Sequence, residues 1–92
     1  MSPEHIADHM KDLPGWTYEN DALSRTFSFG SFQEAISFIV RIAFEAQAMN
    51  HHPELGNVYD EVSVRLTTHD AGNTVSSKDI DLAKRISALS WV

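Results

Sequence analysis

The stretch from Ser31 to Met49, SFQEAISFIVRIAFEAQAM, contains neither proline nor glycine. It opens with Ser31-Phe32-Gln33-Glu34, the S-x-x-E pattern in which a hydroxyl and a carboxylate cap the start of a helix. We therefore expect a long helix from Phe32 to about Met49. In a chain of 92 residues, one such helix constrains the whole fold, because a domain of this size has a single modest core to cover it.

Apolar residues occupy two sides of this predicted helix, more than one sheet can cover. The first stripe comprises Phe32, Ala35, Ile36, Ile39, Val40 and Ala43, and the second comprises Phe38, Ile42 and Met49. We expect part of this helix to be buried against another subunit, because a monomer this small has little else to cover it. The prediction is a homodimer or homotetramer formed through the central helix.

The residues before this helix predict a shorter helix and a hairpin. Ser2 followed by Pro3 is typical of a helix start, and this helix is expected to end near Asp12. From Trp16 to Phe29 polar and apolar residues alternate with a period of two. This pattern predicts a β-hairpin of Trp16–Glu19 and Ala22–Phe29, with Asn20-Asp21 at the turn.

The residues after the central helix predict one long strand and a last helix. VYDEVSVRLTTH, Val58 to His69, alternates like a half-buried strand, and a shorter strand has room near Glu54–Asn57. Ser76 and Asp79 form a second capping box, which opens a helix whose inward residues are Ile80, Leu82, Ala83, Ile86 and Leu89. The predicted fold is α+β, with an antiparallel sheet of three to four strands and three helices on one face, in a single domain over residues 1–92.

Composition excludes several classes of function. The net charge is −6 with seven Lys and Arg, so a surface for direct nucleic-acid binding is not expected. No cysteine is present, which excludes disulfides and thiolate metal sites. No apolar run reaches the roughly 20 residues that cross a bilayer, and the N-terminus is acidic and polar. We expect a cytoplasmic protein without a membrane association.

The histidines are the candidate chemical groups. His51 and His52 follow the central helix and precede Pro53, while His69 ends the predicted strand. One interpretation is a helix end that Pro53 enforces, and a second is a metal site of these three histidines with a carboxylate. The third is metal-free proton transfer, because imidazole titrates near neutral pH. His5 and His9, one helical turn apart, are interpreted as a solvated pair.

The spacing His51-His52-Pro53, Tyr59, His69, Asp79 resembles the signature of the pterin-4a-carbinolamine dehydratase family, whose animal members also act as a dimerisation cofactor of a homeodomain transcription factor. The resemblance extends over GWTYENDALSRTFSF, FQEAISFIVRIAFEAQAMNHHP and NVYDEVSVRLTTHDAG. It implies dehydration of a 4a-hydroxytetrahydropterin to the quinonoid dihydropterin, in recycling of a tetrahydrobiopterin-type cofactor, with no metal or organic cofactor. The pterin itself is the substrate.

The resemblance also implies the site residues. His51 and His69 resemble the family's acid/base pair, and His52 resembles part of the wall that holds the pterin, so all three are expected to be catalytic. The remaining expected substrate contacts are Asn50, Pro53, Thr67, Thr68, Asp70 and Trp16. We interpret Asp79 mainly as a helix cap, because its place in the capping box explains it fully.

Two positions depart from the family pattern and leave the physiological pterin open. Gln47 stands where the family usually has a charged residue, and Leu55 stands where an aromatic residue is common. The alternative function is a pterin-binding or protein-association module, in which Phe38, Ile42 and Met49 would form the contact surface. A link to molybdopterin metabolism is a further alternative.

Overall fold

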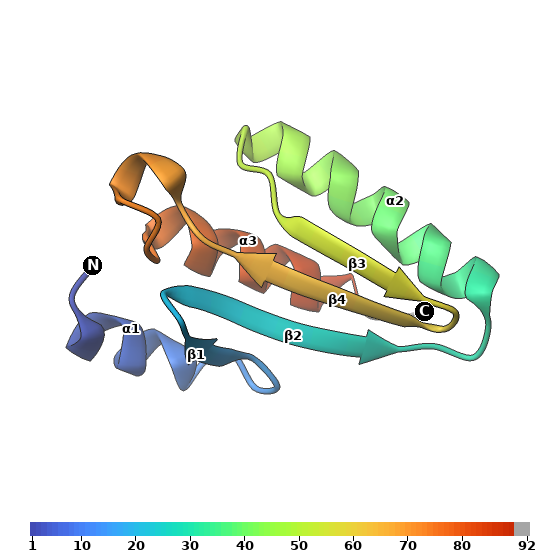
Figure 1. Ribbon diagram of the computed structural model, residues 1–92, viewed down its shortest axis with the longest axis horizontal. Helices are drawn as coiled ribbons and strands as arrows, with labels where there is room; N and C mark the ends of the chain where they lie inside the picture. Colours follow the sequence, from blue (N-terminus) through green and yellow to red (C-terminus); the bar gives the residue numbers. More distant parts are fainter. Residues whose placement is uncertain (90–92) are drawn as a thin grey trace.

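The structure, a computed structural model, describes residues 1–89 and has the α+β fold that the sequence predicted (Figure 1). Its elements are α1 (Pro3–Met10), β1 (Thr17–Glu19), β2 (Ala22–Ser28), α2 (Phe32–Met49), β3 (Glu54–Val58), β4 (Glu61–Leu66), the 3-10 helix η1 (His69–Ala71) and α3 (Ser77–Ala88). Residues 90–92 of the predicted domain lie outside the described residues.

The four strands form one antiparallel sheet in the order β1-β2-β4-β3. Leu23 of β2 lies opposite Leu66 of β4, and Phe27 lies opposite Val62, so their buried side chains share one face. All three helices contribute to the single apolar cluster on this face, with α2 and α3 packed together (Figure 1). The α+β layer with helices on one face is confirmed.

Phe38 of α2 is the aromatic centre of the core. It is fully buried, and its ring centroid lies 4.7 Å from that of Phe27 and 4.9 Å from that of Phe29. Trp16 meets Phe27 edge to face at 6.1 Å. These contacts attach the central helix to β2 and to the segment that leads into the helix.

The hairpin predicted around Asn20-Asp21 is confirmed. Glu19 pairs with Ala22, and the two residues between them have φ values of 52° and 59°. Positive φ at both turn positions fits a two-residue turn whose twist matches that of the strands, and Asn and Asp accept this conformation more readily than most residues.

The single strand predicted from Val58 to His69 is wrong. The chain reverses at Tyr59-Asp60, so that Val58 pairs with Glu61. Val58 therefore ends β3, the short strand expected near Glu54–Asn57, and the longer strand begins only at Glu61, as β4. The side-chain amide of Asn57 donates to the carbonyl oxygens of Tyr59 (3.1 Å) and Glu61 (2.9 Å), which closes this turn. Val58, expected on the buried side, is 76% exposed as a result.

The two stripes on α2 exist, but the prediction of which one stays uncovered is wrong. Phe38 and Ile42 are fully buried by the protein's own sheet and α3. On the other side Val40 is 49% and Phe44 is 72% exposed. Although α2 carries these apolar residues, no helix within residues 1–89 has the length and apolarity that a membrane crossing requires.

We predict that Phe38→Ala lowers the free energy of unfolding by about 3–5 kcal/mol, because it leaves a cavity beside the rings of Phe27 and Phe29. Chemical denaturation measures this loss. Ser37→Ala, at an exposed position of the same helix, serves as the control and should change stability by less than about 0.5 kcal/mol. Equal effects of the two substitutions would contradict the assignment of Phe38 to the centre of the core.

Candidate active site

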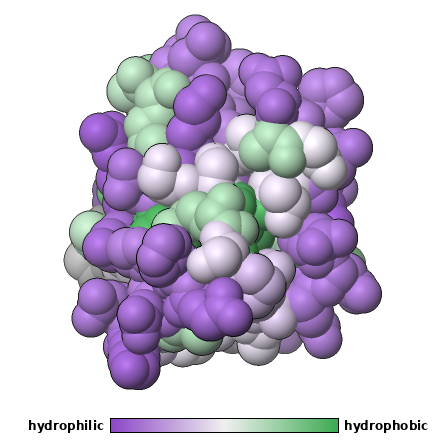
Figure 2. Space-filling model, turned by 90° about the vertical axis from the view of Figure 1, so that its left-hand side faces the viewer, coloured by the Kyte–Doolittle hydropathy of each residue, from purple (hydrophilic) through white to green (hydrophobic). Residues whose placement is uncertain are grey.

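Three segments converge on a pocket of about 220 Å³ at one end of the molecule. They are the C-terminal end of α2, the loop that follows β4 and the first turn of α3, which lie together at the left of Figure 1. The lining residues are Asn50, His51, His52, Thr67, Thr68, His69, Asp70 and Lys78. Figure 2 shows this end of the molecule, where hydrophilic residues surround a smaller apolar area.

The end of α2 places His51 in the pocket. Asn50 takes the left-handed conformation with φ 51°, and the backbone N–H of His51 donates to the carbonyl of Ala46 at 3.0 Å. The N–H of Asn50 donates to Gln47 at 3.1 Å. These two bonds form a Schellman motif, which ends the helix and turns the next residue back toward the molecule. His51 is thereby only 8% exposed.

A buried carboxylate holds the ring of His51. Nε2 of His51 lies 2.5 Å from Oδ1 of Asp79, whose side chain is fully buried at the start of α3. Oδ2 of Asp79 accepts from the Thr68 hydroxyl at 2.7 Å and from the Ser76 backbone N–H at 2.9 Å. The hydroxyls of Thr68 and Ser76 lie 2.6 Å apart. This network joins the end of α2, the end of β4 and the cap of α3.

The other two histidines are exposed, and each is oriented by a neighbouring amide. Nε2 of His52 lies 3.1 Å from Oε1 of Gln47, and Nδ1 of His69 lies 3.1 Å from Oδ1 of Asn73. Because an amide oxygen accepts hydrogen bonds, each of these ring nitrogens carries the hydrogen and the opposite nitrogen is left for a ligand. Gln47, which departs from the family pattern, therefore contacts His52. The side-chain contact of His51 is with Asp79.

Pro53 and Trp16 are the two expected substrate contacts that are absent from the pocket wall. Pro53 is half-buried just beyond His52. Trp16 is 6% exposed in the core, and its indole N–H donates to the Ser87 hydroxyl at 2.9 Å. Its packing accounts for this tryptophan structurally, and the contact of Trp16 with a substrate stays a prediction.

The sequence analysis did not predict two features of the site. One is Lys78 in the pocket wall, and the other is the contact between Asp79 and His51. Lys78 lies in the first turn of α3 and lines the pocket. The sequence signal was present, because Lys78 precedes the acidic residue of the capping box and so belongs to the same helix start. The contact of Asp79 with His51 carried no local signal, because the two residues are 28 positions apart.

Within residues 1–89 no group of three or more His, Cys, Asp or Glu side chains is arranged to hold a metal ion. The interpretation of His51, His52 and His69 as metal ligands therefore finds no ligand set in the part of the chain that the structure describes. Each of the three rings already has one nitrogen bonded to a protein group.

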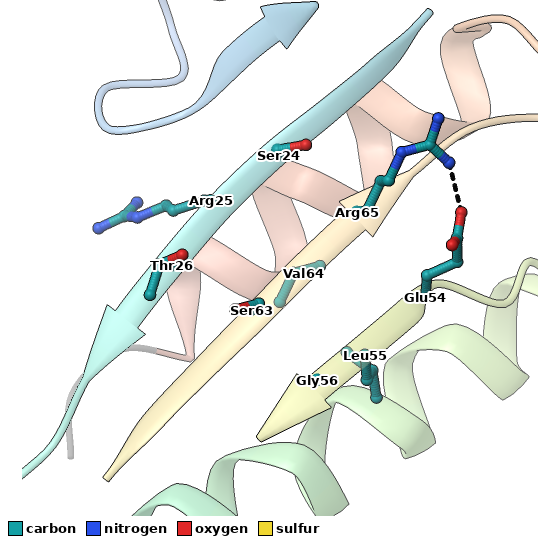
Figure 3. Close-up of a pocket in the computed structure, with 9 residues that line it drawn as sticks. All are labelled: Ser24, Arg25, Thr26, Glu54, Leu55, Gly56, Ser63, Val64 and Arg65. Carbon is teal, nitrogen blue, oxygen red and sulfur yellow. Dashed lines mark hydrogen bonds and ion pairs between the residues drawn. The ribbon is translucent and has the colours of Figure 1, made fainter. Parts of the chain in front are cut away.

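A second hollow lies over the sheet, on the side of Ser24, Thr26 and Ser63 (Figure 3). Its wall contains no histidine. Its charged side chains at one end, Arg65 and Glu54, bond to each other, and Arg65 also donates to the carbonyl of Asn20 at 3.2 Å. The hollow in Figure 3 thus has no imidazole, and its one carboxylate is paired with Arg65, so the histidine pocket is the candidate active site.

A family model described as pterin 4 alpha carbinolamine dehydratase matches residues 1–89. A curated relative from Opitutus terrae is named as a pterin-4-alpha-carbinolamine dehydratase. It is 62% identical over 92 residues, which cover 100% of this chain and 95% of the relative.

The chain also resembles solved structures, among them the following two. One, described as a transcriptional coactivator/pterin dehydratase from Brucella melitensis, has a TM-score of 0.92 and 32% identity, over 98% of this chain and 97% of the other. The second is described as a pterin dehydratase-like protein that is a RuBisCO assembly factor in the alpha-carboxysome. It has a TM-score of 0.68 and 19% identity, over 83% and 87% of the two chains, and shows a likeness of fold alone.

The fold and the pocket together define a small α+β protein with a histidine-lined site. The chain belongs to the pterin 4 alpha carbinolamine dehydratase family, because the family model covers nearly all of it and the relative from Opitutus terrae matches its full length. The resemblance found in the sequence is thereby confirmed.

We predict that Asn50→Ala lowers the free energy of unfolding by about 1–2 kcal/mol, because a left-handed conformation is costly for a residue with a Cβ and without the local hydrogen bonds of Asn. Asn50→Gly is the matched control, since glycine adopts this conformation without strain. Urea denaturation compares the two variants. Equal stability of both would show that the helix end does not depend on this backbone conformation.

Proposed function

We propose that this protein is a hydro-lyase that dehydrates a 4a-hydroxytetrahydropterin to the quinonoid dihydropterin, with His51 and His69 as its acid/base pair. The observation that carries the proposal is the convergence of His51, His52 and His69 on one pocket from two distant segments. The names of the relatives support the same reaction. No metal or organic cofactor takes part in the proposed reaction.

The dehydration requires two groups that exchange protons near neutral pH. The bond between C4a and its hydroxyl oxygen breaks, and the oxygen needs a proton to leave as water, while a proton is released from the ring. A neutral imidazole can take the second proton, and an imidazolium can supply the first. His51 and His69 lie on different segments of the pocket wall, which suits action on different parts of one ring.

The remaining pocket groups serve binding in this proposal. His52 lies beside His51 on the wall, and the polar groups of Thr67, Thr68 and Asp70 offer donors and acceptors to the amide and amine edge of a pterin. Recycling of a tetrahydrobiopterin-type cofactor is the proposed role of the reaction. The cytoplasmic location expected from the sequence stays a prediction.

We predict that His51→Ala and His69→Ala each lower kcat by about 10²-fold or more, because each removes a proton-transfer group. The breakdown of 4a-hydroxytetrahydropterin in a coupled assay measures this. His5→Ala, on the exposed surface of α1, is the control and should retain the wild-type rate. Full activity of both pocket variants would refute the mechanism, and binding of pterins without turnover in the wild type would favour the alternative of a pterin-binding module.

We further propose that the protein forms a homodimer or homotetramer through the exposed side of α2. An apolar groove of about 480 Å³ runs along this side. It is lined by Ile39, Val40, Ala43, Phe44 and Gln47. Phe44 is 72% exposed in the single chain, and burying such a ring against a second copy would remove apolar surface from water.

We predict that Phe44→Lys lowers the mass observed by sedimentation velocity, because a charge in the groove opposes its burial between subunits. Ser37→Lys adds the same charge to α2 at an exposed position outside the groove lining and should leave the mass unchanged. A wild-type protein that sediments as a monomer at micromolar concentration would overturn the proposed assembly.

A further inference from the structure

We infer that Asp79 is a positioning residue that determines which ring nitrogen of His51 exchanges a proton with the substrate. The inference deepens the proposed function and rests on it. Asp79 is fully buried, and its Oδ1 lies 2.5 Å from Nε2 of His51. No other contact of His51 with a charged group occurs within residues 1–89. The question is which of the two atoms carries the hydrogen.

The contacts of the other oxygen of Asp79 are those of an acceptor. Oδ2 accepts from the backbone N–H of Ser76, which can only donate. It also lies 2.7 Å from the hydroxyl of Thr68. If the Thr68 hydroxyl donates to Asp79, its oxygen accepts from the Ser76 hydroxyl at 2.6 Å, while the Ser76 oxygen accepts from the Lys78 N–H at 3.2 Å. Every group in the network is then satisfied with Asp79 as an acceptor throughout.

We take Asp79 as a carboxylate, both of whose oxygens only accept, so His51 donates from Nε2. Nδ1 is the second ring nitrogen, and it makes no hydrogen bond with any of residues 1–89. His51 lines the pocket, so Nδ1 is the nitrogen left for a ligand there. In the neutral ring it has the lone pair that accepts a proton, and in the charged ring it has the hydrogen that is given. Asp79 thus fixes Nδ1 as the reactive atom.

The geometry makes Asp79→Asn a sharp test, because the cap fixes the orientation of the new amide. The Ser76 N–H still requires an acceptor, so the amide oxygen of the variant must take the place of Oδ2. Its NH₂ group then faces Nε2 of His51 and donates to it. His51 responds by moving its hydrogen to Nδ1, so the reactive nitrogen loses its lone pair while the helix cap survives.

The experiment records the ¹⁵N chemical shifts of the His51 ring by NMR at a pH where the ring is neutral, together with kcat and KM for the carbinolamine. We expect the Nε2–H form in the wild type and the Nδ1–H form in Asp79→Asn, with kcat lowered by about 10²-fold or more and KM changed less than kcat. Ser76→Ala is the control. It removes the cap hydroxyl but keeps the backbone N–H, so it should lower the melting temperature and preserve both the Nε2–H form and kcat.

The inference is wrong if the wild-type ring carries its hydrogen on Nδ1, a result that requires no variant to fold. It is also wrong if Asp79→Asn moves the hydrogen to Nδ1 and kcat stays unchanged, or if Ser76→Ala lowers kcat as much as Asp79→Asn does. A wild-type protein that does not turn over the carbinolamine refutes the proposed function. If Asp79→Asn still moves the hydrogen of His51 from Nε2 to Nδ1 in that case, the result supports the control of the His51 ring by Asp79.

Discussion

One buried carboxylate, that of Asp79, connects the three segments that form the pocket. It accepts from the cap of α3, from the end of β4 and from the imidazole that follows α2. A fully buried carboxylate is costly unless its oxygens are bonded, and here the bonds come from three separate parts of the chain. The position of α3 against β4 and α2 and the geometry of the site therefore depend on the same two oxygen atoms.

The N-terminal caps of α2 and α3 show how a local motif acquires a second role. Ser31 accepts from the N–H of Glu34 at the start of α2, and the exposed carboxylate of Glu34 accepts from the N–H of Gly30 at 2.9 Å. At α3, Asp79 completes a capping box, because one of its oxygens accepts from the N–H of the N-cap residue Ser76, and its second oxygen lies 2.5 Å from Nε2 of His51. The cap of α2 stabilises a helix alone. The cap of α3 stabilises a helix and a functional group, because it is buried beside one.

The sequence predicted what local patterns and the family resemblance encode. It identified α2, the capping box of α3, the first hairpin and seven of the eight residues that line the pocket. Prediction from the sequence failed where tertiary contacts determine the structure. The alternation of Val58 with Val62 continues across a turn that Asn57 closes, and the period alone cannot reveal a reversal of the chain. Both stripes of α2 are apolar, so their sequence does not tell which one the sheet covers.

The distance along the chain between the two partners of the site has a consequence for the order of folding. Asp79 follows His51 by 28 residues, and the whole β3–β4 hairpin lies between them. Closing a contact over so many residues costs chain entropy that local elements do not pay. During synthesis α2 can form its cap and helix early, whereas its terminal imidazole stays unconstrained until the first turn of α3 emerges. A functional pocket therefore marks a chain that has completed its fold.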